Sequence, residues 1–263
     1  MSPFSEREEL ETLFDRRGSD VFNFCLRVAG SREAAARATK AAFLGLTLEP
    51  ERNAVAVARC EPGLKVLAAA RREAAELLGD SREDGDAASR LPVQGANQRL
   101  AVHHREALAL RDLAGCSYEE LGRIVGADRE AVAGLLWEAR LALRDELAGS
   151  TLLSIAPLAS SCRRALVLIV MHWDGELHDG GEREWLQRHL RTCGKCRLSQ
   201  EAVRQASTSY RDWPAAPVPL GMRESLAASG PDRRPAAGSG MSSRRQPGSP
   251  PRGARRGARR SPG

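Results

Sequence analysis

The fold of this chain is decided by the stretch SYEELGRIVGAD, residues 117–128. Ser117 and Glu120 have the spacing of a capping box, which predicts a short helix over residues 118–125. The glycine that follows predicts a turn, and Asp128 then caps a longer helix. Two helices joined by a tight turn that contains glycine are typical of a helix-turn-helix.

Helices are also predicted on both sides of this stretch, because apolar residues recur at helical spacing and only 4% of the residues are aromatic. We therefore expect an all-α, multidomain protein. The predicted parts are an N-terminal helical domain over residues 5–78, a helix-turn-helix domain over 97–148, a third helical domain over 158–210, and a disordered Pro/Arg-rich tail over 214–263.

Local signals divide the N-terminal domain further. Gly30 and Ser31 predict the end of one helix and the start of the next, and Pro50 predicts the end of that second helix. Cys25 and Cys116 lie on apolar helical faces, so we expect both thiols in the core. Cys60, beside a Glu-Pro break, carries no comparable signal.

The third domain contains a candidate metal site. Its motif is HLRTCGKC, residues 189–196, which supplies His189, Cys193 and Cys196, and 26 residues separate Cys162 from His189. Thiolate and imidazole are the ligands that tetrahedral Zn²⁺ prefers, so these four residues predict a Zn²⁺ site. His189 is expected to share a helical face with Cys193.

The role of this zinc site remains open between a regulatory switch and a structural staple of a small bundle. His172 and His178 lie nearby in the sequence. His172 could replace Cys162 as a ligand, or it could be an ordinary surface histidine.

The charge of the chain is uneven. Nine Arg and one Asp give residues 231–263 a charge of +8, so the remaining residues sum to −2 within the total of +6. The tail could tether nucleic acid nonspecifically, or it could be a solvated end without a partner.

Other classes of protein are not favoured. No run of residues approaches the about 20 apolar residues of a membrane span, and the N-terminus has no signal-peptide pattern, so we expect a cytoplasmic protein without a membrane partner. His103 and His104 have no nucleophile or paired carboxylates beside them, and no glycine-rich phosphate loop is present. We expect no catalytic function.

Two parts of the chain carry a resemblance to a known family. Residues 105–122, and the later Val132, Ala139-Arg140 and Ala142-Leu143-Arg144, resemble the promoter-binding domain of extracytoplasmic-function sigma factors, which belong to the sigma-70-like proteins. The sequence WDGEL at residues 173–177, followed by the histidine and cysteines, resembles a zinc-binding anti-sigma domain. The N-terminal domain resembles the sigma domain that binds polymerase and melts the −10 element.

The resemblance implies regulation of transcription initiation. A sigma factor binds core RNA polymerase and places its helix-turn-helix in the major groove of promoter DNA at the −35 element. The fused anti-sigma-like domain would act as an intramolecular clamp at high effective concentration. The residues implied at the DNA are Arg129, Trp137, Arg140 and Arg144. Trp137 could instead pack against Leu121.

A second function is kept open by the charge of the recognition helix. Residues 128–143 contain two Arg against three acidic residues, a net charge of −1, so this helix gains little from phosphate neutralisation. The chain could therefore be an anti-sigma-like interaction module that sequesters another transcription regulator without binding DNA.

Overall fold

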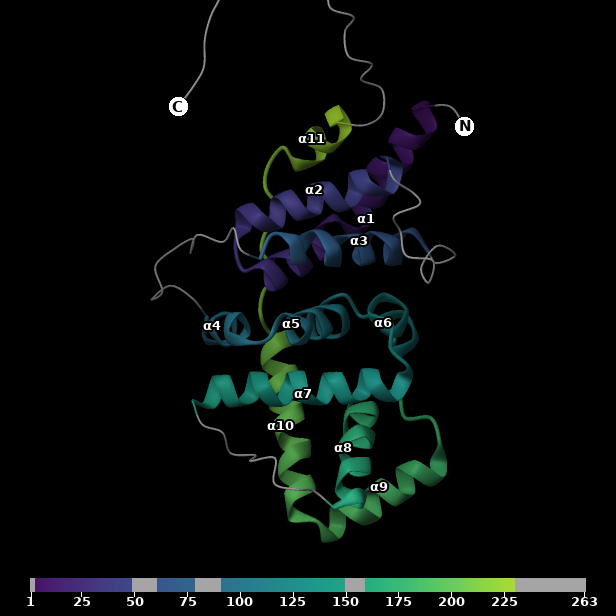
Figure 1. Cartoon of the computed structure of the whole chain (residues 1–263), viewed down its shortest axis with the longest axis vertical. Coiled ribbons are helices and arrows are strands. Elements are labelled where there is room, and N and C mark those ends of the chain that lie inside the picture. The colour runs from purple at the N-terminus through teal and green to yellow at the C-terminus, as the bar shows by residue number, and fades with distance from the viewer. Residues whose placement is uncertain (1–2, 49–60, 79–90, 150–158, 230–263) are drawn as a thin grey trace, which may run out of the picture. The chain divides into compact units, whose positions relative to one another are not determined.

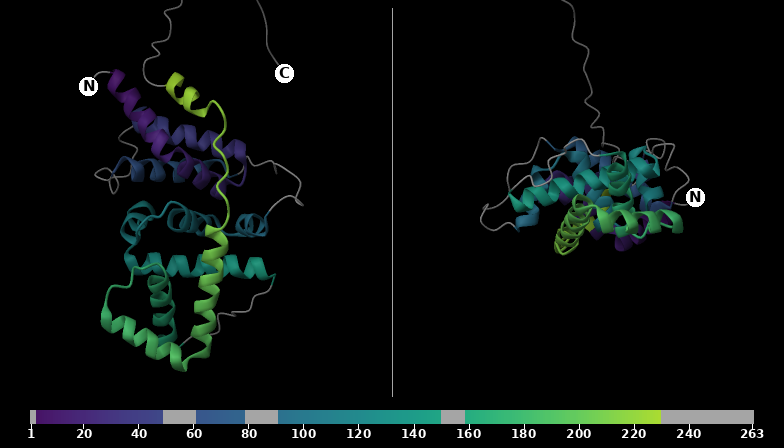
Figure 2. Two further views of the ribbon diagram at one scale, coloured as in Figure 1. Left: turned by 180° about the vertical axis from the view of Figure 1, so that it is seen from behind. Right: turned by 90° about the horizontal axis from the view of Figure 1, so that it is seen from below.

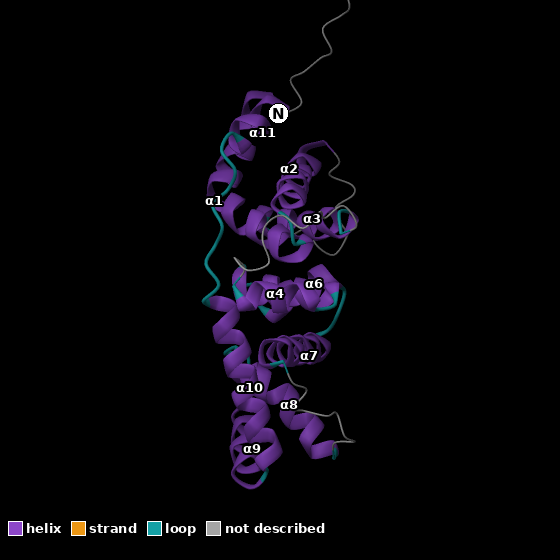
Figure 3. Cartoon of the chain, turned by 90° about the vertical axis from the view of Figure 1, so that its left-hand side faces the viewer, coloured by secondary structure: helices purple, strands orange, loops and turns teal. Residues whose placement is uncertain are grey.

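The computed structural model describes residues 3–48, 61–78, 91–149 and 159–229, and all regular structure in these ranges is helical (Figure 1 and Figure 3). The all-α prediction is confirmed. The helices are α1 (Pro3–Ala29), α2 (Arg32–Leu48), α3 (Pro62–Glu76), α4 (Pro92–Arg99), α5 (Val102–Leu108), η4 (Ala109–Leu113), α6 (Tyr118–Val125), α7 (Arg129–Ala148), α8 (Ser160–Trp173), α9 (Gly180–Thr192), α10 (Gly194–Arg211) and α11 (Met222–Ser229). Among the described helices, none has the length and apolarity needed to cross a membrane.

The first three helices pack against one another around apolar side chains. Val21, Phe22 and Phe43 are fully buried there. Gly30 adopts a φ of 85° after α1, and the Ser31 hydroxyl accepts a hydrogen bond from the Ala34 N–H at 3.1 Å. The predicted break between α1 and α2 is confirmed, because glycine tolerates this left-handed conformation and serine caps the next helix.

The helix-turn-helix is built as the sequence predicts. The Ser117 side chain accepts the Glu120 N–H and the Glu120 carboxylate accepts the Ser117 N–H at 2.8 Å, which completes the capping box of α6. Gly126 takes the left-handed conformation in the turn, and Asp128 caps α7 by accepting the Ala131 N–H at 2.8 Å. A Cβ atom at Gly122 would lie 2.5 Å from the Ala127 carbonyl oxygen, so the tight turn requires this glycine.

Helix α7 lies between two sets of helices. In Figure 1, α4 and α5 pack on one side of it and α8 and α10 on the other, and the same four helices are its main neighbours. One hydrophobic core accordingly includes residues of all three predicted domains, such as Phe22, Leu136 and Ile169. The predicted domains are thus continuous in their packing.

The segment after α10 departs from the predicted tail. Residues 214–229 are described, and they lead to α11, which packs on α1 and α2 (Figure 2). Arg27 explains this path: its guanidinium lies over the rings of Tyr210 and Trp213 and donates to their carbonyl oxygens at 3.1 and 2.7 Å. The predicted tail start at 214 is therefore too early. Residues 230–263 lie outside the described ranges, as does Cys60.

Two further expectations concern thiols in the core. Cys25 and Cys116 are buried, as predicted. Burial raises the pKa of each thiol to about 12, so both stay protonated and unreactive at neutral pH.

Replacing Ser117 with alanine should lower the free energy of unfolding by about 1 kcal/mol, because the Glu120 N–H at the start of α6 loses its side-chain acceptor. Denaturant unfolding followed by circular dichroism measures this difference. The control is Thr208→Ala, at an exposed position of α10, which should stay within about 0.5 kcal/mol of the parent chain. Equal losses in both variants would contradict the capping role.

Candidate metal centre and its contact with the helix-turn-helix

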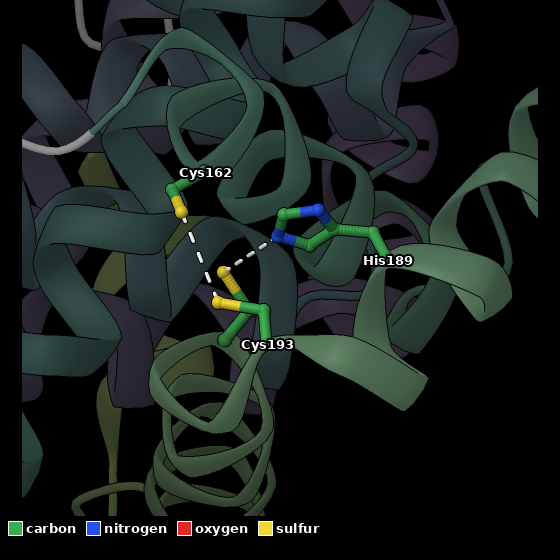
Figure 4. Close-up of side chains that lie close together, drawn as sticks. Cys162, His189 and Cys193 are labelled. Carbon is green, nitrogen blue, oxygen red and sulfur yellow. Dashed lines mark hydrogen bonds between the residues drawn. The ribbon is translucent and has the colours of Figure 1, made fainter.

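The four predicted metal ligands meet at one end of three helices. Cys162 lies in the first turn of α8, His189 in the last turn of α9, and Cys196 in the first turn of α10. Cys193 occupies the junction between α9 and α10. Figure 4 shows the side chains of Cys162, His189 and Cys193 converging from these elements.

The distances within the cluster suit a single metal ion. The Sγ atoms of Cys162 and Cys193 are 3.9 Å apart, and Nε2 of His189 lies 3.3 Å from Sγ of Cys196. All four ligand atoms lie within 4.8 Å of one another. A tetrahedral ion with bonds of about 2.3 Å to sulfur separates two sulfurs by about 3.8 Å. The Cys₃His cluster could therefore hold a metal ion.

One detail of the sequence prediction is corrected. Cys193 does not share a helical face with His189, because α9 ends at Thr192 and Cys193 has extended backbone angles, φ −104° and ψ 102°. Arg197 helps to close this corner by donating from Nη1 to the Leu190 and Arg191 carbonyl oxygens at 2.9 and 3.0 Å. The break turns Cys193 and Cys196 toward the same point as the imidazole.

The thiols of this cluster differ in their surroundings. Burial raises the pKa of the Cys196 thiol, whereas a hydrogen bond from the backbone N–H of Cys196 lowers the pKa of Cys193. His172 and His178 are exposed and stand outside the cluster. The group that could hold a metal ion is thus Cys162, His189, Cys193 and Cys196, and neither histidine belongs to it.

A second polar cluster lies where the third domain meets the helix-turn-helix. Arg140 of α7 has no exposed side-chain surface, and neither have its partners Asp112 and Asp174. Nη2 of Arg140 lies 3.0 Å from Asp112 and 2.8 Å from Asp174. Although burial acts in the opposite direction, the two carboxylates raise the pKa of Arg140 above its ordinary value. The guanidinium is permanently charged and joins η4 to the end of α8.

Further contacts surround the same carboxylates. The Tyr118 hydroxyl donates to Asp174 at 2.8 Å, and burial together with this carboxylate raises the pKa of the tyrosine. Arg111 donates to the Asp174 carbonyl oxygen at 2.6 Å, and Arg211 of α10 pairs with Asp112 at 2.7 Å. We call Arg111, Asp112, Tyr118, Arg140, Asp174 and Arg211 the Arg140 cluster.

Glu176 adds a contact at the edge of this cluster. Its carboxylate accepts the Tyr118 N–H at 3.2 Å and pairs with Arg111 and Arg129, both at 3.3 Å. Arg129 also donates to the Glu176 carbonyl oxygen. The turn after α8 therefore binds the start of both helices of the helix-turn-helix.

The four residues that the sequence analysis implies at the DNA differ in how exposed their side chains are. Arg129 is exposed at the start of α7, Trp137 is half-buried against the core, and Arg140 is buried in its cluster. Arg144 is largely buried and pairs with the neighbouring Asp145 at 3.0 Å. In this conformation, Arg129 alone of the four has an exposed side chain, and Glu176 engages it.

Sequence reasoning did not single out Asp112 or Tyr118, which the structure places in the Arg140 cluster. The sequence WDGEL, which the resemblance singled out, contains Asp174 and Glu176. It does not indicate which side chains these two carboxylates contact. Comparison of this chain with protein-family models, curated proteins and solved structures gives no match.

The reduced chain should bind one Co²⁺ or Zn²⁺ ion, and Cys193→Ser should lose this binding. Since this change removes a ligand itself, the affinity should fall by more than the about 10- to 100-fold typical of losing a supporting residue. Competition against a chromophoric chelator measures it. Cys25→Ala, a buried cysteine outside the cluster, serves as the control. Equal binding by both variants would exclude the site.

Proposed function

We propose that this chain is a sigma-factor-like regulator of transcription initiation whose helix-turn-helix is held closed by its own zinc-binding, anti-sigma-like domain. Its partners would be core RNA polymerase and promoter DNA, both met in the cytoplasm. The observation that carries the proposal is the burial of Arg140. This residue of the recognition helix α7 has its guanidinium buried against Asp174 of the third domain.

The donor set supports zinc as the metal. Three thiolates and one imidazole match a closed, structural Zn²⁺ site and disfavour hard cations such as Mg²⁺, which prefer oxygen. Bound zinc would supply cross-links between Cys162 of α8 and the ligands of α9 and α10. The chain itself provides the convergence of the three helix ends.

Two helices join the metal site to the Arg140 cluster. Helix α8 has Cys162 at its start and is followed directly by Asp174, about 18 Å along the axis. Helix α10 has Cys196 in its first turn and Arg211 in its last, so it runs between the same two sites. Release of the metal would free one end of both helices, and the opposite ends hold the helix-turn-helix. This geometry supports coupling between metal loss and opening.

The packing of α7 and α1 supports a closed state. Helices α8 and α10 both pack on α7, and Ala133 and Leu141 of α7 are buried. At the other end of the chain, the segment after α10 binds α1: Asn23 exchanges hydrogen bonds with the backbone of Ala216 at 2.7 and 3.0 Å. Helix α11 adds an ion pair of 2.8 Å between Arg223 and Asp15. Both sigma-like domains are thus covered by residues that follow α7.

A second candidate function has its own support. Most of the buried residues of α7 are apolar, and the recognition helix has a net charge of −1. Such a helix suits permanent packing better than DNA phosphates. In this reading the sigma-like domains are a scaffold, and the chain sequesters another regulator through its surface.

The two functions can be separated with bacterial core RNA polymerase. We compare the parent chain, Asp174→Ala and the double variant Cys193→Ser/Cys196→Ser for co-elution with the enzyme and for run-off transcription on a library of random promoter-sized DNA fragments. The opened variants should exceed the parent by at least about tenfold, because they lose the tethered inhibitor.

The control is Glu184→Gln, which removes an exposed charge paired with Arg188 at 3.0 Å on α9. It should behave as the parent chain. Opened variants that stay folded and transcribe no more than the parent would reject self-inhibition. Absence of polymerase binding in every variant would favour the interaction module.

A further inference from the structure

The indole ring of Trp185 stacks on the imidazole of His189 in the candidate metal centre. The ring centroid of Trp185 lies 5.2 Å from that of His189, with an angle of 9° between the planes. The two residues are four positions apart on α9, so their side chains share one face of the helix. This separation is typical of offset stacking between aromatic rings.

Helix α8 also contacts the ring of Trp185. The Cζ atom of Arg164 lies 4.6 Å from the centroid of the Trp185 ring, within the range of a cation–π contact. Arg164 also approaches Glu182 of α9, at 3.6 Å. Asp179 fixes that first turn of α9 by accepting the Glu182 N–H at 2.7 Å. Trp185 thus contacts Arg164 of α8 as well as His189 of its own helix.

The contacts of Arg164 connect α8 and α9, the helices that supply Cys162 and His189. Arg164 stands two residues after Cys162 on α8, and Trp185 stands one turn before His189 on α9. Contacts from Arg164 to α9 therefore fix the relative position of a sulfur ligand and a nitrogen ligand. Partners that orient a ligating histidine raise the metal affinity of a site, because less order is lost when the ion binds.

We infer that Trp185 and Arg164 are positioning residues of the metal centre, which hold the His189 ring in its ligating orientation and α8 in register with α9. The inference rests on the proposed zinc site. Neither side chain is a ligand: both act through the orientation of His189 and Cys162.

The test is a Co²⁺ titration of the full chain under reducing conditions, followed by the absorption of the thiolate–cobalt bands. Trp185→Leu should weaken Co²⁺ binding by about 10- to 100-fold, as loss of a supporting partner does. Trp185→Phe retains a stacking ring and should stay within about threefold of the parent chain. Arg164→Met keeps the aliphatic stem, and loss of its cation–π contact should weaken binding by about two- to fivefold.

Arg188→Ala is the matched control, because it removes an exposed arginine of α9 that pairs with Glu184 at 3.0 Å. It should bind Co²⁺ as the parent chain does. Parent-like affinity in Trp185→Leu would overturn the inference, as would an equal loss in Trp185→Leu and Trp185→Phe, since a ring would then have no special role. If the parent chain itself bound no Co²⁺, the zinc proposal would fail before the positioning question arose.

Discussion

The arrangement of this chain depends on one buried charge, the guanidinium of Arg140 between the carboxylates of Asp112 and Asp174. Removing such a charge from water is costly, and it is tolerated only when partners with good geometry surround it. Here one carboxylate belongs to the helix-turn-helix domain and the other follows α8. The interaction therefore selects one docking of the third domain on α7, because any other docking would leave a charge buried without its partner.

The metal centre and the Arg140 cluster occupy opposite ends of α8 and α10. Either site alone would leave these helices free to splay at the other end, whereas both together fix their spacing. A domain this short gains much from such fixed ends, because it has few residues with which to build an apolar core of its own. On our proposal, this arrangement makes the helix-turn-helix sensitive to what happens at the distant cysteines.

Local sequence signals predicted much of this structure, but they did not predict the contacts between residues far apart in the sequence. Ser117 with Glu120 and the turn at Gly126 follow from spacing around helix ends. The chemistry of thiol and imidazole side chains singled out the four residues that the structure brings together, Cys162, His189, Cys193 and Cys196. The burial of Arg140 does not follow from local signals, because an arginine on a helix surface gives no sign of the domain that will cover it. The same holds for Arg27, whose partners Tyr210 and Trp213 lie more than 180 residues away, so composition alone assigned residues 214–229 to a tail.

The central claim is that Arg140 and Asp174 join the two domains energetically. A double-mutant cycle with Arg140→Met, Asp174→Asn and the combined variant measures their coupling from the free energies of unfolding in denaturant. A coupling energy of at least about 1.5 kcal/mol is predicted, since the two groups are in contact and buried. If the loss of stability in the combined variant equalled the sum of the two single losses within about 0.5 kcal/mol, the result would contradict the account.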